Sequence, residues 1–511
     1  MSLIKRNIHM DCCQGDIRKQ FTLDQDYNIP DIKPDAQTIV KEQGEVRNAE
    51  FRVNNGKVSV KGEVVFQIVY LSEDDGTLQG LRGSIPFEAT FPADMMEQEN
   101  YSLLADVEKF NAHLINSRKT SLSAVIVLRL LNQGICDSEL AVGVSEDEDV
   151  YVQKELTSLS TLTAVKKDTL RARDQWNLPP TKDSIGEFLY WDIRLGELTS
   201  RCLENEVQLT GQATVFAMYL SDGEEPEVNL YENTLPVEGV ISCNGVMPDM
   251  IPRIVTSIVG KDVGVMEDDD GENRTIEAEL VIQVDAKVYA GEQVEILTDL
   301  YSTKKKCTPI REESSFRNLQ THNISRCRVQ GDLDVTSGKP QQVWDVCGSV
   351  NIERTTRTPA GLEVEGTLTA RALYPTDSTR TPIGTSEGKI PFRQVMDAPD
   401  LTEHSTMDLQ CRLEQVNGNV AGEKNIQVKA VICFELIAFD KMEHPVVVDV
   451  KYEEFEQEKN NMPEMVGYVI QPGDTLWDVA KEYYTTVERI KEVNKLTSED
   501  VEEGSMILVV N

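Results

Sequence analysis

One strand pattern occurs three times in this chain, and it restricts the fold more than any other feature. The segments read VSVKGEVVFQIVY at 58–70, VQLTGQATVFAMY at 207–219 and LEVEGTLTARALY at 362–374. In each segment every second residue is mostly apolar, which is the two-residue period of a strand with one buried face. We therefore expect three copies of one strand-rich unit.

The surroundings of this strand recur at nearly constant spacing. In each copy a glycine precedes the final tyrosine by eight residues, at 62/70, 211/219 and 366/374. A proline follows each glycine by 24 or 25 residues, in Ile85-Pro86-Phe87, Leu235-Pro236-Val237 and Ile390-Pro391-Phe392. A period of about 150 residues exceeds the 20–50 residues of solenoid units, so these are domains. Each is expected to be a β-sandwich or a barrel-like sheet.

Two recurring residues have structural interpretations. Glycine inside a strand permits a bulge or the close approach of another backbone, which we expect here rather than ligand binding. The tyrosines are expected to anchor the strand ends. The predicted organisation is an irregular N-terminal segment at 1–28, β repeats at 29–146, 174–299 and 318–451, an acidic linker at 452–466 and a small module at 467–511. Residues 147–173 and 300–317 would link the repeats.

The last 45 residues, 467–511, show a different pattern. A short β-prone run at 468–470 ends at Pro472-Gly473, after which Asp474 is predicted to cap a helix. The predicted apolar face of that helix contains Leu476, Val479, Ala480 and Tyr483. Thr485 and Glu488 fit a capping box for a second helix. Its predicted inner face contains Val487, Ile490 and Val493, and an apolar run at 506–510 suits a paired strand. The module is thus predicted to be βααβ, and the whole chain mainly β.

The motif YVIQPGDTLW at 468–477, with Thr485-Thr486-Val487 and Asn494-Lys495-Leu496, resembles a LysM domain. This resemblance implies a carbohydrate-binding module, usually for N-acetylglucosamine polymers such as peptidoglycan or chitin. It also implies a groove between the loop before the first helix and the loop after the second. The groove residues would be Gly473, Asp474, Thr475, Leu476, Asn494, Lys495 and Leu496. The chain departs from the family at Glu503-Gly504-Ser505, where Pro-Gly-Gln is common.

Acidic residues strongly outnumber basic ones, with 87 Asp and Glu against 51 Lys and Arg, for a net charge of −36. No block of Lys and Arg could follow a phosphate backbone, so we expect no nucleic-acid partner. An anionic membrane surface is equally unfavourable. No stretch approaches 18 consecutive apolar residues, so we expect no membrane insertion. A basic protein surface would be attracted.

The cysteines and the N-terminus favour a reducing, intracellular compartment. Ten cysteines are scattered without a CxxC pair or a metal-ligand spacing, and the strand residue Cys433 is expected to behave as a small apolar side chain. Residues 1–13, MSLIKRNIHMDCC, lack the apolar run of a secretory signal. This compartment conflicts with a simple role in binding external cell-wall glycan.

Three strand-rich copies, an acidic tether and a LysM-like module resemble the SipL-type spore-coat morphogenetic proteins of spore-forming anaerobes, whose repeat is the SPOCS domain. The supporting residues are the Gly…Tyr strands, the Ile-Pro-Phe elements and PDIKPD at 30–35; copy two departs with Leu-Pro-Val at 235–237 and Leu178-Pro179-Pro180. The resemblance covers nearly the whole chain. It implies a protein of the mother-cell cytosol at the outer membrane surface of the developing spore. There the LysM-like module would grip a coat-basement morphogenetic ATPase rather than glycan.

Motifs that indicate catalysis are not found. The chain has no GxxxxGK[ST], GxGxxG, HExxH or GxSxG, and its five histidines recur in no motif that would place a base beside a nucleophile. Asp268, Asp270, Gly271 and Glu277 partly match a calcium loop, but Met266 occupies its first ligand position, so an acidic hairpin turn at 269–271 is favoured. We expect no catalytic residues, no cofactor and no metal.

Two functional hypotheses remain. The first is a non-enzymatic spore-coat assembly adaptor that binds the morphogenetic ATPase through the LysM-like module and recruits other coat proteins. The second is a cell-wall-associated protein that binds peptidoglycan or other N-acetylglucosamine glycans. A wall hydrolase targeted by this module would need a catalytic motif.

Overall fold

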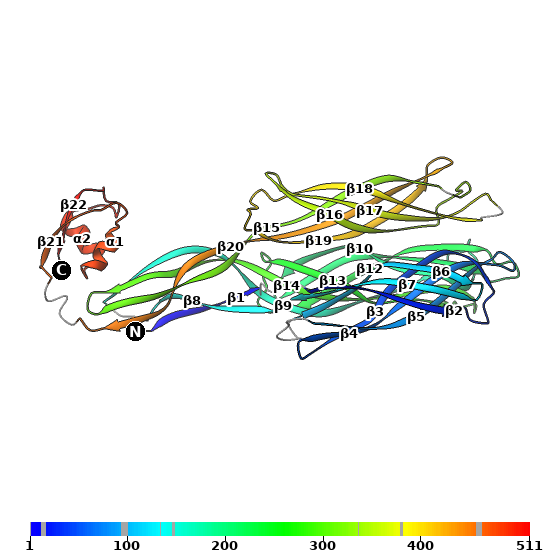
Figure 1. Ribbon diagram of the computed structural model, residues 1–511, viewed down its shortest axis with the longest axis horizontal. Coiled ribbons are helices and arrows are strands. Elements are labelled where there is room, and N and C mark those ends of the chain that lie inside the picture. Colours follow the sequence, from blue (N-terminus) through cyan, green and yellow to red (C-terminus); the bar gives the residue numbers. More distant parts are fainter. Residues whose placement is uncertain are drawn as a thin grey trace.

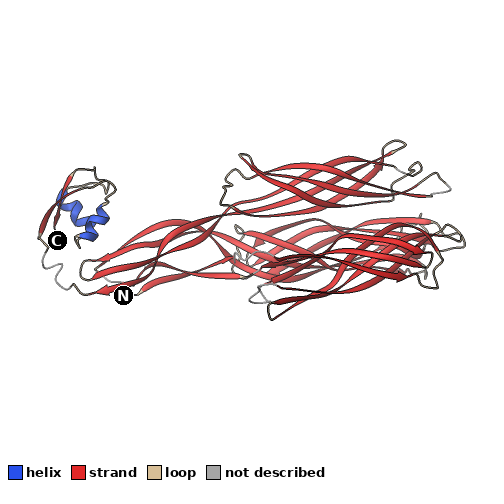
Figure 2. Cartoon of the chain, in the orientation of Figure 1, coloured by secondary structure: helices blue, strands red, loops and turns tan. Residues whose placement is uncertain are grey.

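The computed structural model describes residues 2–11, 17–92, 101–132, 134–145, 149–335, 337–378, 382–455 and 462–510. Most of these residues lie in strands, and both helices lie in the C-terminal module (Figure 2). Cys12, Cys13, Asp147, residues 456–461 of the predicted linker and Asn511 lie outside the described residues.

Each repeat is a sandwich of two three-stranded antiparallel sheets. In repeat 1 the first sheet is β3 (Ala36–Asn54), β4 (Lys57–Ser72) and β5 (Leu78–Pro92), and the second is β2 (Ile17–Asn28), β7 (Lys119–Asn132) and β6 (Tyr101–Asn116). In repeat 2 the first sheet is β10 (Ile185–Leu203), β11 (Glu206–Ser221) and β12 (Val228–Ser242). The second is β9 (Val150–Asn177), β14 (Asn273–Ser302) and β13 (Ile251–Glu267). In repeat 3 the first sheet is β16 (Asp345–Thr358), β17 (Gly361–Pro375) and β18 (Ile383–Asp397). The second is β15 (Lys306–Asp334), β20 (Asn425–Glu453) and β19 (Thr406–Val420).

The three recurring segments form the central strands β4, β11 and β17. Their alternating side chains fill the space between the two sheets, and Val64, Val215 and Leu368 are fully buried there. The recurring prolines lie in β5, β12 and β18, which are edge strands, where a residue without an N–H group removes no bond from the middle of the sheet. The predicted mainly β fold with tandem sandwiches is confirmed.

The recurring glycines lie beside bulges in the neighbouring strand, as expected. The register shifts between Arg47 and Glu50 next to Gly62, and equivalent shifts lie next to Gly211 and Gly366. A Cβ atom on Gly211 would lie 2.3 Å from the Glu197 carbonyl oxygen. Glycine is therefore required because the bulged backbone approaches the central strand too closely for a side chain.

The recurring tyrosines anchor the ends of the central strands, which confirms that prediction. Each ring is buried, and each hydroxyl donates to a backbone carbonyl that precedes it by 36 or 37 residues. The acceptors are Pro34 for Tyr70 (3.0 Å), Asp183 for Tyr219 (3.3 Å) and Ser337 for Tyr374 (3.4 Å). The tyrosine thus ties the chain that enters each repeat to its central strand.

A stalk extends from the three sandwiches (Figure 1). It is built from three antiparallel ribbons: β1 (Leu3–Asp11) with β8 (Ile135–Val144), the outer halves of β9 and β14, and the outer halves of β15 and β20. Register shifts at Thr163 in β9 and at Gln320 in β15 mark where two of these ribbons leave their sandwiches. One apolar cluster joins all three ribbons and contains Ile8, Leu140, Leu159, Val294, Ile296, Phe316 and Val446.

Equivalent strands of the three repeats meet at the centre of the molecule. Lys41, Tyr190 and Asp345 pair with the residue that precedes the recurring tyrosine in their own repeat, so their positions are equivalent. The Lys41 ammonium lies 2.7 Å from Asp345 and 4.3 Å from the centroid of the Tyr190 ring. The repeats are therefore arranged about an approximate threefold axis.

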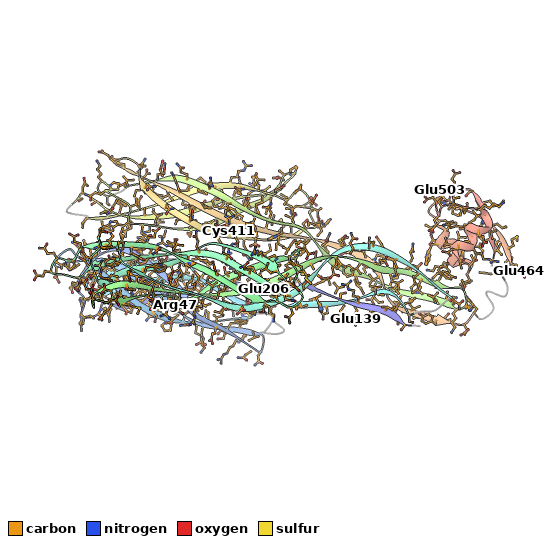
Figure 3. The ribbon with its side chains drawn as sticks, turned by 180° about the vertical axis from the view of Figure 1, so that it is seen from behind. Arg47, Glu139, Glu206, Cys411, Glu464 and Glu503 are labelled. Atoms are coloured by element: carbon orange, nitrogen blue, oxygen red, sulfur yellow. The ribbon has the colours of Figure 1, made fainter. Side chains whose placement is uncertain are left out.

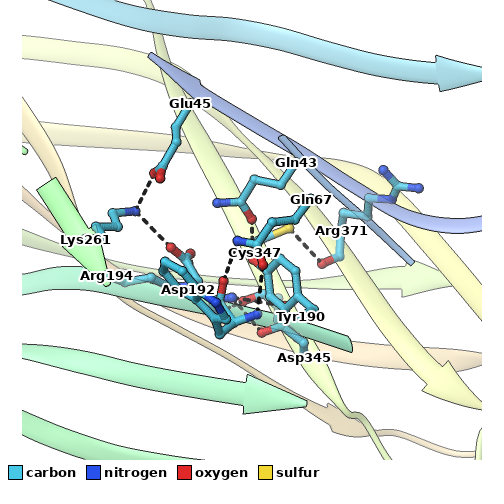
Figure 4. Close-up of polar contacts among 12 residues, drawn as sticks. Gln43, Glu45, Gln67, Tyr190, Asp192, Arg194, Lys261, Asp345, Cys347 and Arg371 are labelled. Atoms are coloured by element: carbon cyan, nitrogen blue, oxygen red, sulfur yellow. Dashed lines mark hydrogen bonds and ion pairs between the residues drawn. The ribbon is translucent and has the colours of Figure 1, made fainter. Parts of the chain in front are cut away.

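A buried polar network surrounds this axis (Figure 4). Arg194 bonds Asp345 (2.8 Å) and Asp192 (3.0 Å), and Lys261 bonds Asp192 (2.8 Å) and Glu45 (2.9 Å). Burial opposes ionisation of Asp345, but the charges of Arg194 and Lys41 outweigh it and lower the pKa of this carboxyl. The network thus joins all three repeats with opposite charges paired.

The structure corrects two parts of the expected organisation. The N-terminal segment 1–28, predicted to be irregular, contains the strands β1 (Leu3–Asp11) and β2 (Ile17–Asn28). The segments 147–173 and 300–317, expected as links, lie largely in β9, β14 and β15. Some of their apolar side chains, such as Leu159 and Phe316, pack in the core of the stalk. The alternating pattern of a single sandwich gives no sign of such contacts between ribbons. The domain limits 29–146, 174–299 and 318–451 stay a proposal.

Other expectations concern single features. The segment at 269–271 is a turn between β13 and β14, in which Asp268 accepts from the amides of Asp270 and Glu272 (3.0 Å each), as predicted. Cys433 is a buried free thiol, also as predicted, whereas Cys136 is disulfide-bonded, which the cysteine spacing did not indicate. Among the described residues, no helix is long and apolar enough to cross a membrane.

Candidate binding groove of the C-terminal module

The C-terminal module is built as the sequence predicted, from β21 (Met465–Val469), α1 (Leu476–Glu482), α2 (Val487–Asn494) and β22 (Met506–Val510). The two strands pair antiparallel. Its small core contains Ile470, Leu476, Val479, Ala480, Val487, Ile490, Ile507 and Val509. Val493, expected on the inner face of α2, is 36% exposed instead, because α2 turns this side away from the strands.

The first groove loop is fixed by Asp474. Its Oδ2 atom accepts from the Tyr468 hydroxyl (2.6 Å) and from the Gln471 amide (2.8 Å). These bonds lower the pKa of Asp474 and raise the pKa of Tyr468 to about 12. Asp474 therefore stabilises the loop, and it is not the helix cap that the sequence analysis assigned to it.

The caps of both helices lie one residue later than predicted. Thr475 caps α1 by accepting from the Asp478 amide (3.2 Å), and the Asp478 carboxylate accepts in turn from the Thr475 amide (3.1 Å). Thr486, rather than Thr485, caps α2 by accepting from the Arg489 amide (3.0 Å). In both motifs two adjacent polar residues could act as the helix cap, and only the backbone geometry shows which of them does.

The second groove loop is held by Asn494. Its amide group donates to the carbonyls of Ile490 (2.8 Å) and Leu508 (2.7 Å), and its oxygen accepts from the Leu508 amide (2.7 Å). Lys495 follows in the left-handed conformation (φ +54°) that ends α2. Asn494 thus joins α2 to β22, and these three side-chain bonds all lie within the module.

The seven predicted groove residues divide into supporting and accessible groups. Leu476 is buried and Leu496 packs against the same core, so both loops attach to one cluster. Gly473, Thr475 and Lys495 are exposed. The accessible surface is therefore backbone around Gly473, one hydroxyl and one ammonium group, which can form hydrogen bonds with a ligand. Among the residues that the structure describes, no cluster of His, Cys, Asp or Glu could hold a metal.

The module is attached to the end of the stalk through α1 and the turn after it. Asp299 in β14 accepts from Trp477 Nε1 (2.9 Å) and Lys481 Nζ (2.7 Å), and it also pairs with Arg311 (2.6 Å). The Tyr301 ring contacts the Trp477 ring edge to face, with centroids 4.9 Å apart. The Tyr301 hydroxyl donates to the Thr485 carbonyl (2.9 Å).

This attachment leaves the groove loops uncovered. Lys481 and Trp477 face the stalk, whereas Gly473, Thr475 and Lys495 remain exposed. The sequence analysis did not identify Trp477, Lys481 or Asp299 as an interface. The available signal was an aromatic residue and a lysine at i, i+4 outside the apolar face of α1.

Comparisons with known proteins agree with these geometries. The family model "SipL, SPOCS domain" matches residues 35–115 and 339–421, which lie in repeats 1 and 3, and the LysM domain model matches residues 468–510. A search of curated proteins and a search of solved structures found no match. Both domain families are non-catalytic, and together they support a coat-related protein of sporulation with a LysM domain of glycan-binding type. The chain has the domain composition of a SipL-type protein, with SPOCS domains followed by a C-terminal LysM domain.

Proposed function

We propose that this chain is a non-enzymatic adaptor of spore-coat assembly. Its LysM domain docks onto the morphogenetic ATPase of the coat basement layer, at the outer membrane surface of the forespore in the mother-cell cytosol. The three SPOCS-like sandwiches recruit other coat proteins. The domain composition supports the connection to the coat, and the proposal adds the partner and the place.

One observation carries the adaptor role. The LysM domain lies at the far end of the stalk, whereas the three sandwiches pack together at the other end (Figure 1). The docked domain keeps Gly473, Thr475 and Lys495 exposed. The exposed loops of the LysM domain and the surfaces of the sandwiches are therefore far apart on one chain, an arrangement that supports a role in bridging two partners.

Charge supports a protein partner with a basic surface. The chain carries a net charge of −36, and acidic residues lie on opposite sides of the C-terminal module, with Glu464 just before β21 and Glu503 before β22 (Figure 3). Opposite charge on a partner increases the rate of encounter and disfavours wrong partners more than it increases affinity.

The test is a pull-down with the full chain and a groove variant that keeps the fold. Thr475→Asn preserves a capping side chain that can still donate to Asp478, while Lys495→Asn removes a positive charge and tolerates the left-handed backbone. The control is Lys451→Asn, at an exposed position of β20. We expect the double variant to lose the ATPase and the control to retain it, with circular dichroism unchanged in both. Full binding by the folded double variant would exclude the groove as the docking surface.

Glycan binding is the second candidate, because the exposed loop at Gly473 and Thr475 has the composition of the family groove. Calorimetric titration of the chain with chitooligosaccharides measures it directly. Heat that disappears in the groove variant would support cell-wall glycan as the ligand. If the titration releases no heat and the chain still captures the ATPase in the pull-down, the result would support the adaptor role and exclude glycan as the ligand.

A further inference from the structure

The strand β2 forms an open edge of repeat 1, whereas the equivalent strands of the other two repeats are covered. In each repeat one outer strand of the second sheet is β2, β9 or β15. The strand β9 lies against β12 and β15 lies against β18, where the Ser386 hydroxyl donates to the Asp334 carbonyl. Among the described residues, β2 has no comparable contact with β5. One side of repeat 1 is therefore left without a neighbouring strand.

The hydrogen bonds of β2 show which of its backbone groups face the open side. Its ladder with β7 contains no bulge. Just beyond the strand, the Ile29 amide donates to the Arg118 carbonyl of the β7 side (2.8 Å). The Tyr27 carbonyl accepts from Thr120 of β7 (3.1 Å), so the odd-numbered residues face β7. Because successive residues of a strand alternate in direction, the even-numbered residues turn their N–H and C=O groups to the open side. These outward residues, all exposed, are Arg18, Gln20, Thr22, Asp24, Asp26 and Asn28.

In β9 some of the equivalent amides are already bonded. Thr169 and Gln175 face away from β14, by the same alternation. Their amides donate to the side chains of the preceding residues, Asp168 (2.7 Å) and Asp174 (2.8 Å). Within the part of the chain that the structure describes, no bond of this kind reaches the outward backbone groups of β2. An edge strand with free donors and acceptors is a template for the addition of another strand.

The outward residues of β2 are complementary to the same residues of a second copy. Their charge runs from basic at Arg18 to acidic at Asp24 and Asp26. In an antiparallel pair of two such strands, outward residues must lie opposite outward residues. Two registers then overlap nearly the whole strand, one centred on Thr22 and one on Leu23. The register centred on Thr22 places Arg18 opposite Asp26 of the second copy, on both sides of the twofold axis. About ten inter-strand hydrogen bonds would form, two for each hydrogen-bonded pair.

The inner face of β2 matches in the same register. Phe21 and Leu23 are partly buried in the core of repeat 1. Phe21 would lie opposite Leu23 of the second copy, and Ile17 opposite its Tyr27. Apolar side chains therefore meet apolar side chains on the inner face, while opposite charges meet on the outer face.

The charges around Arg18 favour an additional carboxylate. Arg18 lies directly opposite Arg129 of β7, and Arg129 is 3.8 Å from its partner Asp106. Like charges directly opposite each other destabilise a sheet. Asp26 pairs with Lys119 of its own copy (2.7 Å) through Oδ2. A carboxylate accepts on both oxygens, so Asp26 can also receive a bond from Arg18 of the second copy.

The equivalent strands carry a residue that disfavours the same pairing. The residues Ile29, Leu178 and Val335 are equivalent, because each amide donates across the end of its ladder. Counting back equally from each of them gives Thr22 in β2, Arg171 in β9 and Arg328 in β15. Two arginines that face each other at a twofold axis would repel. Of the three strands, β2 alone combines an open edge with a neutral central residue.

We propose that two copies of this chain associate through β2. The two β2 strands pair antiparallel with Thr22 on the twofold axis, so that β6, β7 and β2 of both copies form one continuous sheet. The contact is self-complementary and closed, because each copy uses the same edge and no further copy can add to it. Each dimer carries two LysM domains, whatever ligand these domains take.

The experiment is sedimentation equilibrium of the full chain over a range of protein concentrations. We expect a reversible equilibrium between monomer and dimer. Thr22→Arg places two guanidinium groups at the axis and should weaken the dimer by about tenfold or more. The control is Thr169→Arg, at an exposed position on the covered edge of β9, and it should associate as the native chain does. A native chain that stays monomeric, or a folded Thr22→Arg variant that dimerises as tightly as the native chain, would overturn the proposal.

Charge reversal tests the register. In a dimer of Arg18→Asp two carboxylates face each other at each end of the contact, and in a dimer of Asp26→Arg two guanidinium groups do. Each variant alone should therefore associate about tenfold more weakly than the native chain, with unchanged circular dichroism. An equimolar mixture of the two variants restores both opposite-charge pairs and should dimerise. A mixture that associates no better than the separate folded variants would contradict the pairing of Arg18 with Asp26.

Discussion

Asp299 is the residue through which the stalk holds the LysM domain. Burial opposes its ionisation, but hydrogen bonds from Lys481 and Trp477, with the charges of Lys481 and Arg311, outweigh burial and lower its pKa. Trp477 and Lys481 of the LysM domain both donate to this one carboxylate, so a single stalk side chain orients the whole domain. The charge of Asp299 therefore determines how the groove of the LysM domain is oriented on the stalk.

Replacing Asp299 should release the LysM domain from the stalk. Asp299→Asn keeps the volume but removes the charge that pairs with Lys481 and Arg311. We expect a larger radius of gyration by small-angle scattering, with unchanged circular dichroism. Glu295→Gln, whose carboxylate pairs with Lys154 in the same ribbon, is the control and should leave the radius unchanged.

The lowered pKa also predicts how docking depends on pH. A carboxyl group with a depressed pKa contributes fully above its ordinary value of about 3.9, and the contribution disappears as the pH falls toward the depressed value. Docking should thus persist at neutral pH and be lost in acid. The radius of gyration of the native chain should rise as the pH falls below about 4, and a constant radius with an intact fold would contradict the role of Asp299.

At the scale of elements, the bulge beside each recurring glycine shapes the sandwich. The bulged backbone of β10 approaches β11 so closely that a Cβ on Gly211 would meet the Glu197 carbonyl at 2.3 Å. Gly211→Ala should lower stability by about 1–3 kcal/mol, the usual cost of overpacking, as measured by urea denaturation. Gly264→Ala is the matched control, because nothing lies within 4 Å of that Cβ position in β13, and it should be close to neutral.

Elements with a strict local period could be predicted from the sequence, and elements stabilised by distant contacts could not. The alternation at 58–70, 207–219 and 362–374 predicted the central strands because one face of each is buried within its own sandwich. The outer halves of β9 and β15 read as links, because their buried residues contact other ribbons. In the LysM domain the elements and most of the core followed from periodicity, whereas its attachment through Trp477 depends on Asp299, 178 residues away.

At the scale of the whole molecule, triplication has produced a threefold arrangement with three different residues at its axis. Lys41, Tyr190 and Asp345 occupy equivalent positions, yet one is cationic, one aromatic and one anionic. Identical charged residues would repel one another at these distances. The repeats therefore differ where they meet, which explains why a recurring strand pattern reveals the domains but not their assembly.

The two charged residues at this axis should contribute unequally to stability. Asp345 serves both Lys41 (2.7 Å) and Arg194 (2.8 Å), and the side chains of Lys41 and Asp345 are only 7% and 2% exposed. Asp345→Asn removes the counter-charge of the buried Lys41 and one of the two carboxylate partners of the partly buried Arg194, and should cost about 3–5 kcal/mol. Lys41→Met leaves Asp345 paired with Arg194 and should cost less, about 1–3 kcal/mol for a lost charged hydrogen bond. Urea denaturation of both variants measures the difference. An equal or reversed order would mean that the Lys41–Asp345 pair, rather than the pairing of Asp345 with two cations, holds the three repeats together.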